Sequence, residues 1–199
     1  MNHDEMLAMK PEDLRQAWMT KGNPNVQEFD RNEALWEYWR RVADCEIEYS
    51  FEDLEAAFAS GLPDIQQGVN RLIERMRLPL EDFPRVRMLA TQLSPDSAVY
   101  VRAFLNAREA LEAIKAGACL GRGTLLDDLL EKGVWWAAIE SMPYLQQEER
   151  DYLIASAEQR KVFSRGWRHE LRAVRQRLEK KEGQGKTRRT KKPPDGQEK

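Results

Sequence analysis

The apolar residues of this chain recur at spacings of three and four, within short segments that each have helix start and stop signals. This spacing is that of one face of an α-helix. Between residues 31 and 48, the residues with this spacing are Leu35, Trp36, Trp39, Val42, Ala43 and Ile47. We find no alternating pattern bounded by hairpin turns, as strands would require. The sequence therefore predicts an all-α fold, an irregular bundle of about seven or eight short-to-medium helices with a long basic C-terminal helix and a disordered tail.

Capping residues place several helix ends. Ser94-Pro95-Asp96 combines a cap, a proline at the first position and an acid in the first turn. Ser50 precedes a second predicted helix, which stops at Gly61. Residues 134–139 are continuously apolar and are compatible with a strand, but their length and neighbours favour a short buried helix.

Charge is divided unevenly along the chain. Residues 1–159 contain 17 Lys and Arg against 29 Asp and Glu, a net charge of −12, whereas residues 160–199 contain 15 against 5, a net charge of +10. With the helix signals, this predicts four parts: a weakly ordered N-terminal segment (1–28), an acidic α-helical body (29–159), a basic amphipathic helix (160–182) and a disordered basic tail (183–199).

The basic part of the chain is the first candidate for a functional site. Cations on a helix and on a flexible tail can contact the phosphates of a nucleic acid without reading its bases. The candidate nucleic-acid-binding residues are Arg165, Arg168, Arg172, Arg175, Lys180, Lys181, Lys186, Arg188, Arg189, Lys191 and Lys192. A solubilising tail on an exposed helix is the alternative interpretation.

The same helix has one apolar stripe, spaced almost as a heptad seam. Its members are Phe163, Trp167, Leu171, Val174 and Leu178. The seam can pair with a partner helix or with a second copy of itself. The adjacent Trp135 and Trp136 cannot both face the same side of a helix, so one of them can mark a partner surface. The predicted partner-binding residues are Trp135, Trp136, Phe163, Trp167 and Leu171.

Two further segments resemble binding motifs in outline only. Residues 51–76 give a short helix, a turn and a second helix bearing Gln66, Gln67, Asn70 and Arg71, which are residue types that read base edges. Gly68 in the second helix weakens that interpretation, and ordinary helix packing is favoured. Residues 117–124 contain three glycines that could cradle an anion with Arg122, although a helix C-cap followed by a turn is the stronger interpretation.

We predict no catalytic residues, no metal site and no cofactor. The two histidines lie at opposite ends of the chain, and Cys45 and Cys119 are expected to be buried, reduced thiols. With no apparent signal peptide and no long apolar run, the chain is expected to be cytoplasmic, without a membrane partner.

The leading hypothesis is a non-enzymatic accessory or regulatory protein of nucleic-acid metabolism. In it the acidic body binds a protein and the basic C-terminal arm contacts the DNA or RNA backbone, with a homo-oligomer possible through the C-terminal helix. The alternative is a protein–protein adaptor or inhibitor that acts through its helical surfaces without nucleic acid. A helical enzyme with scattered site residues is a third, weaker class.

Overall fold

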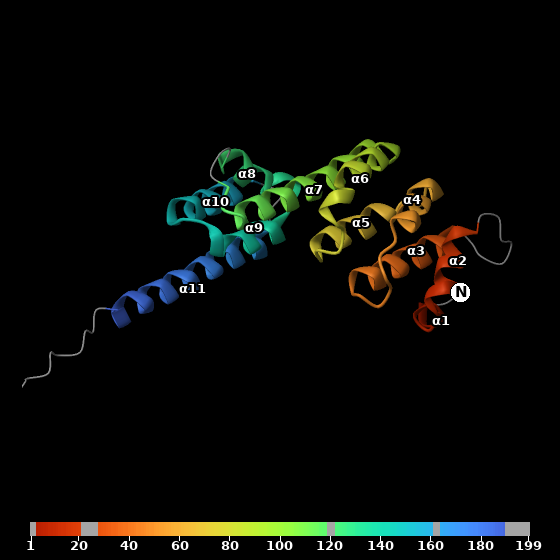
Figure 1. Ribbon diagram of the computed structural model, residues 1–199, viewed down its shortest axis with the longest axis horizontal. Helices are drawn as coiled ribbons and strands as arrows, with labels where there is room; N and C mark the ends of the chain where they lie inside the picture. The colour runs from red at the N-terminus through yellow and green to blue at the C-terminus, as the bar shows by residue number, and fades with distance from the viewer. Residues whose placement is uncertain (1–2, 21–27, 119–121, 161–163, 190–199) are drawn as a thin grey trace, which may run out of the picture. The chain divides into compact units, whose positions relative to one another are not determined.

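The computed structural model describes residues 3–20, 28–118, 122–160 and 164–189, except for the side chains of residues 3, 28, 29 and 182–189 (Figure 1). These residues form helices and no strand, which confirms the all-α class. No helix in the described ranges is both long enough and apolar enough to cross a bilayer. The chain divides into two compact units, Met1–Ala110 and Leu111–Lys199.

The first unit is organised around one central helix, α3. Its elements are α1 (His3–Leu7), α2 (Pro11–Met19), α3 (Glu28–Ala43), α4 (Phe51–Ser60), α5 (Ile65–Glu74), the 3-10 turn η1 (Leu80–Asp82), α6 (Phe83–Leu89), the 3-10 turn η2 (Ala90–Gln92) and most of α7 (Pro95–Lys115). Helices α1, α2 and α5 all contact α3. The fully buried Trp18 of α2 and Trp39 of α3 lie in this core. Segment 1–28, predicted as weakly ordered, thus contains two helices anchored by buried side chains.

The predicted caps of this unit are confirmed. The Asp53 backbone N–H donates to Ser50 Oγ over 3.3 Å at the start of α4, and the helix ends at Gly61 with a φ of 72°. The Ser97 backbone N–H likewise donates to Ser94 Oγ, where Pro95 opens α7. Each cap satisfies a backbone donor that a helix end leaves unpaired.

Three buried charged side chains of this unit are paired: Glu37, Arg41 and Asp53. Glu37, of which 6% of the side chain is exposed, accepts hydrogen bonds from Arg40 and Arg41 at 2.7 Å each. Burial alone would raise the pKa of the Glu37 carboxyl, but these two guanidinium groups outweigh burial and lower its pKa overall. Asp53 accepts hydrogen bonds from Tyr38 and Arg15, which ties α4 to α3 and α2.

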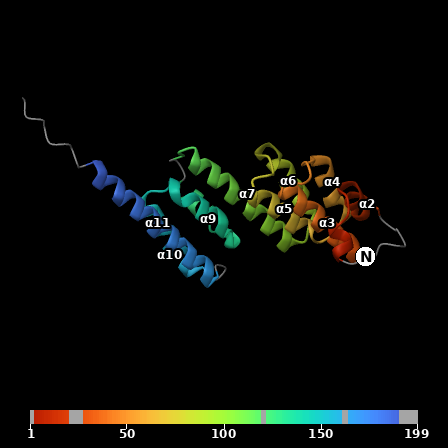
Figure 2. The ribbon, with the colours of Figure 1, turned by 90° about the horizontal axis from the view of Figure 1, so that it is seen from below.

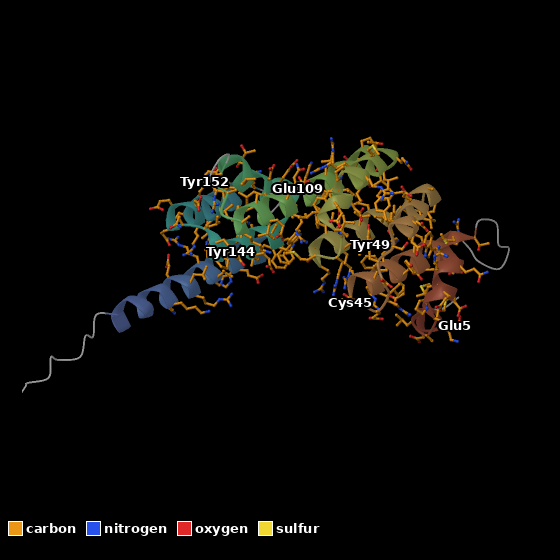
Figure 3. All side chains as sticks on the ribbon, viewed as in Figure 1. Glu5, Cys45, Tyr49, Glu109, Tyr144 and Tyr152 are labelled. Atoms are coloured by element: carbon orange, nitrogen blue, oxygen red, sulfur yellow. The ribbon has the colours of Figure 1, made fainter. Side chains whose placement is uncertain are left out.

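Cys45 is not buried, contrary to the prediction from the sequence. The thiol is exposed, because α3 ends at Ala43 and Cys45 follows in the left-handed region, with a φ of 68° (Figure 3). The predicted apolar period continues to Ile47, four residues past the end of α3 at Ala43, and so crosses a helix C-terminus. Cys119 lies outside the described residues.

The second unit contains the C-terminal helices. Its elements are the end of α7, α8 (Arg122–Asp128), the 3-10 turn η3 (Glu131–Gly133), α9 (Trp135–Ser141), the 3-10 turn η4 (Met142–Tyr144), α10 (Gln147–Gln159) and α11 (Arg165–Arg189). Residues 135–139 are helical, as predicted, and α9 begins at Trp135. Helix α11 contacts α9, η4 and α10. It runs past the predicted end at residue 182, whereas residues 190–199 of the expected tail lie outside the described part.

Candidate functional site

The apolar stripe of α11 is used within its own unit. Leu171 is fully buried, and the Trp167 ring stacks on Trp135 of α9 with centroids 3.3 Å apart and planes 9° from parallel. Trp136 is buried at 5% exposure. The packing of α9 and α11 therefore buries two of the residues predicted to bind a partner, Trp136 and Leu171. It leaves the stacked Trp135 and Trp167 partly exposed, and Phe163 lies outside the described residues.

A second side of α11 faces the acidic residues of α10. Arg168 donates to the Glu158 backbone carbonyl at 3.2 Å, and Arg172 binds the Glu158 carboxylate. Arg175 binds Asp151 at 2.7 Å and Glu179, one turn along its own helix, at 2.8 Å. The hydrogen bond from Arg175 lowers the pKa of the Glu179 carboxyl.

These pairs divide the predicted phosphate contacts into two sets. The ion pairs of Arg172 and Arg175 are part-exposed and add little stability, but a phosphate reaching them would have to displace a carboxylate. Arg165, Lys180 and Lys181 are exposed and make no ion pair with any described side chain. The backbone of Lys186, Arg188 and Arg189 continues α11, and Lys191 and Lys192 lie outside the described residues.

The free cations of the second set lie mainly toward the C-terminal end of α11. Figures 1 and 2 both show this end extending past α9 and α10 of the same unit. On α11, Arg172 and Arg175 face α10 and are paired with carboxylates, whereas the exposed Arg165, Lys180 and Lys181 make no ion pair with a described side chain.

A groove of about 340 Å³ follows the third side of α11. It is lined by Ile139, Glu140, Pro143, Tyr144, Val174, Arg177, Leu178 and Lys181. Tyr144 is 49% exposed (labelled in Figure 3), and Val174 and Leu178 are only half-buried. Arg177 uses its Nε on the Ala173 carbonyl of its own helix and makes no ion pair with the described side chains. We call this site the α9–α11 groove.

The helix–turn–helix outline of residues 51–76 is a packing element. A Cβ on Gly68 would lie 2.9 Å from the Cβ of Trp39, so the glycine permits the close approach of α5 to α3. Arg71 donates to Asp44 and lies over the Trp36 ring, and Gln67 donates to Asp64. Two of the four expected base-reading side chains are therefore engaged within the unit.

Arg122 closes the glycine-containing segment. It binds the Glu149 carboxylate at 2.7 Å and the backbone carbonyls of Ala118 at 2.5 Å and Tyr144 at 3.2 Å. Burial raises the pKa of the Glu149 carboxyl, but the hydrogen bonds from Arg122 and from the Gln146 backbone N–H, together with the charge of Arg122, lower the pKa overall. The guanidinium thus links α8 to α10 and is already bound by protein groups, which disfavours the anion cradle; residues 119–121 of the segment lie outside the described part.

The groove residues are the part of the site that sequence reasoning missed. Val174 and Leu178 belong to the predicted seam, but Ile139, Pro143 and Tyr144 have no sequence signal that places them opposite α11. No cluster of three or more His, Cys, Asp or Glu side chains with metal-binding geometry occurs within the described ranges. Comparison with protein-family models, curated proteins and solved structures finds no match to the chain.

Proposed function

We propose that this chain is a non-enzymatic accessory protein of nucleic-acid metabolism whose C-terminal arm, from Lys180 onward, contacts the DNA or RNA backbone. The observation that carries the proposal is the division of cations on α11. Arg172 and Arg175 are paired with carboxylates, whereas Lys180 and Lys181 are exposed and unpaired among the described side chains.

Electrostatics favours the arm over the rest of the chain as the contact. Residues 1–159 have a net charge of −12 and repel a polyanion, so attraction must come from residues 160–199. Within that part, a free ammonium group binds phosphate without first losing a carboxylate partner. Such contacts have no base specificity and are strongly salt-dependent.

The test is a salt series on a fluorescent duplex and on a single-stranded RNA, with the full chain and two variants. The arm variant replaces Lys186, Arg188, Arg189, Lys191 and Lys192 by Gln. If all five contact duplex phosphates, the slope of log K against log salt becomes shallower by about 4.5, at about 0.9 per contact.

The matched control is Arg172→Gln, which removes one cation that is paired with Glu158. It should change the slope by much less than one unit. Absence of binding by the intact chain at low salt, or an equal effect per charge in both variants, would contradict the assignment to the arm.

A second candidate, a protein–protein adaptor, is favoured by a separate observation. The α9–α11 groove leaves Tyr144 49% exposed and Val174 and Leu178 partly exposed, beside cations. Grooves of this kind between helices receive amphipathic helices in many complexes. The two proposed functions share one described residue, because Lys181 belongs to the arm and also lines the groove.

A further inference from the structure

The α9–α11 groove has an apolar floor with opposite charges at its two edges. Val174 and Leu178 of α11 face Ile139 of α9 and Pro143 and Tyr144 of η4. Arg177 and Lys181 lie one turn apart on the α11 edge, and Glu140 lies on the α9 edge. None of these three charges is paired with another described side chain. Each of them can therefore form an ion pair with an oppositely charged group of a ligand.

We propose that this groove binds a short acidic amphipathic helix of a partner protein. The proposal names the partner chemistry of the protein-binding part of the proposed function, and it does not depend on nucleic-acid binding. The apolar floor needs an apolar ligand face, because water against partly exposed Val174, Leu178 and Tyr144 is displaced favourably by such a face. The two free cations select carboxylates on the flank that faces α11.

The groove dimensions define the ligand. Val174 and Lys181 are seven residues apart, which corresponds to about 10 Å along a helix. This length accommodates about two turns of a ligand helix. The ligand therefore has two large apolar side chains four residues apart, which share one face. Glu or Asp lies on the flank toward Arg177 and Lys181, and a Lys or Arg suits the flank toward Glu140.

Other occupants fit less well. A nucleic-acid backbone has no apolar face to pack on the groove floor, and Glu140 repels its phosphates. A second copy of the chain would have to present an apolar, acid-flanked helical face, and a concentration-dependent mass in solution identifies that case. The charges of α11 that face α10 are already paired, so they do not compete with Arg177 and Lys181 for the ligand.

The test uses the full chain and two designed fluorescent helical peptides. Both peptides present two Leu four residues apart; one has three Glu on one flank and the other has three Lys in the same places. Fluorescence anisotropy should show the Glu peptide binding more tightly, by up to about 25-fold for two pairs, since each exposed pair contributes up to about fivefold. The charge-reversal variant R177E/K181E should invert this preference.

Two controls make the outcome specific. Lys180→Glu has the same charge change as one reversal but lies off the groove, and it should retain the preference for the Glu peptide. Leu178→Ser should weaken both peptides by about tenfold, with unchanged helix content by circular dichroism and unchanged duplex binding. Equal binding of the two peptides, no binding of either, or an effect of Lys180→Glu equal to that of R177E would overturn the proposal.

The same variants separate this proposal from the nucleic-acid contact. The arm variant with Gln at residues 186, 188, 189, 191 and 192 should lose duplex affinity and bind the Glu peptide as the intact chain does. Loss of peptide selectivity in the arm variant would overturn the groove assignment. Loss of duplex binding in that variant alone, with the groove preference intact, is the expected result.

Discussion

Replacing Gly68 by Ala should destabilise the first unit, although the same change usually stabilises a helix. Alanine is favoured over glycine in a helix interior by about 1 kcal/mol. At Gly68, however, the new Cβ would lie 2.9 Å from the Cβ, 3.0 Å from the Cγ and 3.2 Å from the Cδ1 of Trp39. Carbon atoms in favourable contact are about 3.5–4.0 Å apart, so all three distances are too short.

The neighbouring side chain has no room to yield. Trp39 is fully buried, and the atoms concerned lie close to its backbone, so a rotamer change cannot remove the overlap. Helix α5 must therefore move from α3 by several tenths of an ångström. Overpacking of this kind costs about 1–3 kcal/mol, which leaves a net loss of up to about 2 kcal/mol after the helix-propensity gain.

Thermal unfolding followed by circular dichroism measures the effect. For a domain of about 100 residues, each kcal/mol lowers the melting temperature by about 4 °C. The matched control is Gly166→Ala in α11, where the nearest atom to the new Cβ is Ser164 Oγ at 3.8 Å, and it should be neutral or stabilising. A Gly68→Ala protein that melts at or above the temperature of the wild type would refute the close-approach argument.

Three further perturbations test other parts of the structure. Leu171→Ala should cost about 2–5 kcal/mol in urea unfolding and speed hydrogen exchange of α11, because Leu171 is fully buried. With Glu37→Gln, the free energy of unfolding should depend less steeply on pH below about pH 5. The lowered pKa of Glu37 means that its stabilisation is present above the unfolded-state pKa and is lost as the pH falls through the folded value. Arg122→Ala should lower stability by about 1–3 kcal/mol in denaturant titrations, since the Glu149 carboxylate and two carbonyls lose a charged donor.

The sequence predicts helix ends well where a residue type has one main structural role at that position. Ser50 and Ser94 both serve as caps because a hydroxyl before an apolar-periodic segment satisfies a helix-end N–H. The two residues that precede α9 and α11 show the limit of this reasoning. Val134 does not separate from its neighbours by a strong signal, so the sequence places the start of α9 only approximately. The sequence predicts the start of α11 near Arg160, five residues before Arg165, although Ser164 accepts a hydrogen bond from the Trp167 backbone N–H as a cap.

Tertiary relations were not accessible in the same way. The pairing of Arg172 with Glu158 depends on how α10 and α11 cross, and neither helix encodes this in its own period. Burial of Trp18 likewise requires α2 to return onto α3. The groove depends in the same way on how separate helices pack together. Its floor is formed by residues about 35 positions apart in the sequence, such as Ile139 and Val174.

Helix α11 has no apolar side chain after Leu178, although its helical backbone continues to Arg189. The last three turns thus have no hydrophobic anchor, and their helicity depends on local terms alone, which Gly183 and Gly185 weaken. In such a segment, ordering and anion binding form one coupled equilibrium, since a polyanion that relieves repulsion among the cations also favours the helix. The length of α11 then depends on whether a polyanion is bound. The helical signal of the chain in far-ultraviolet circular dichroism should increase as duplex is added, and it should return to its starting value as salt displaces the duplex.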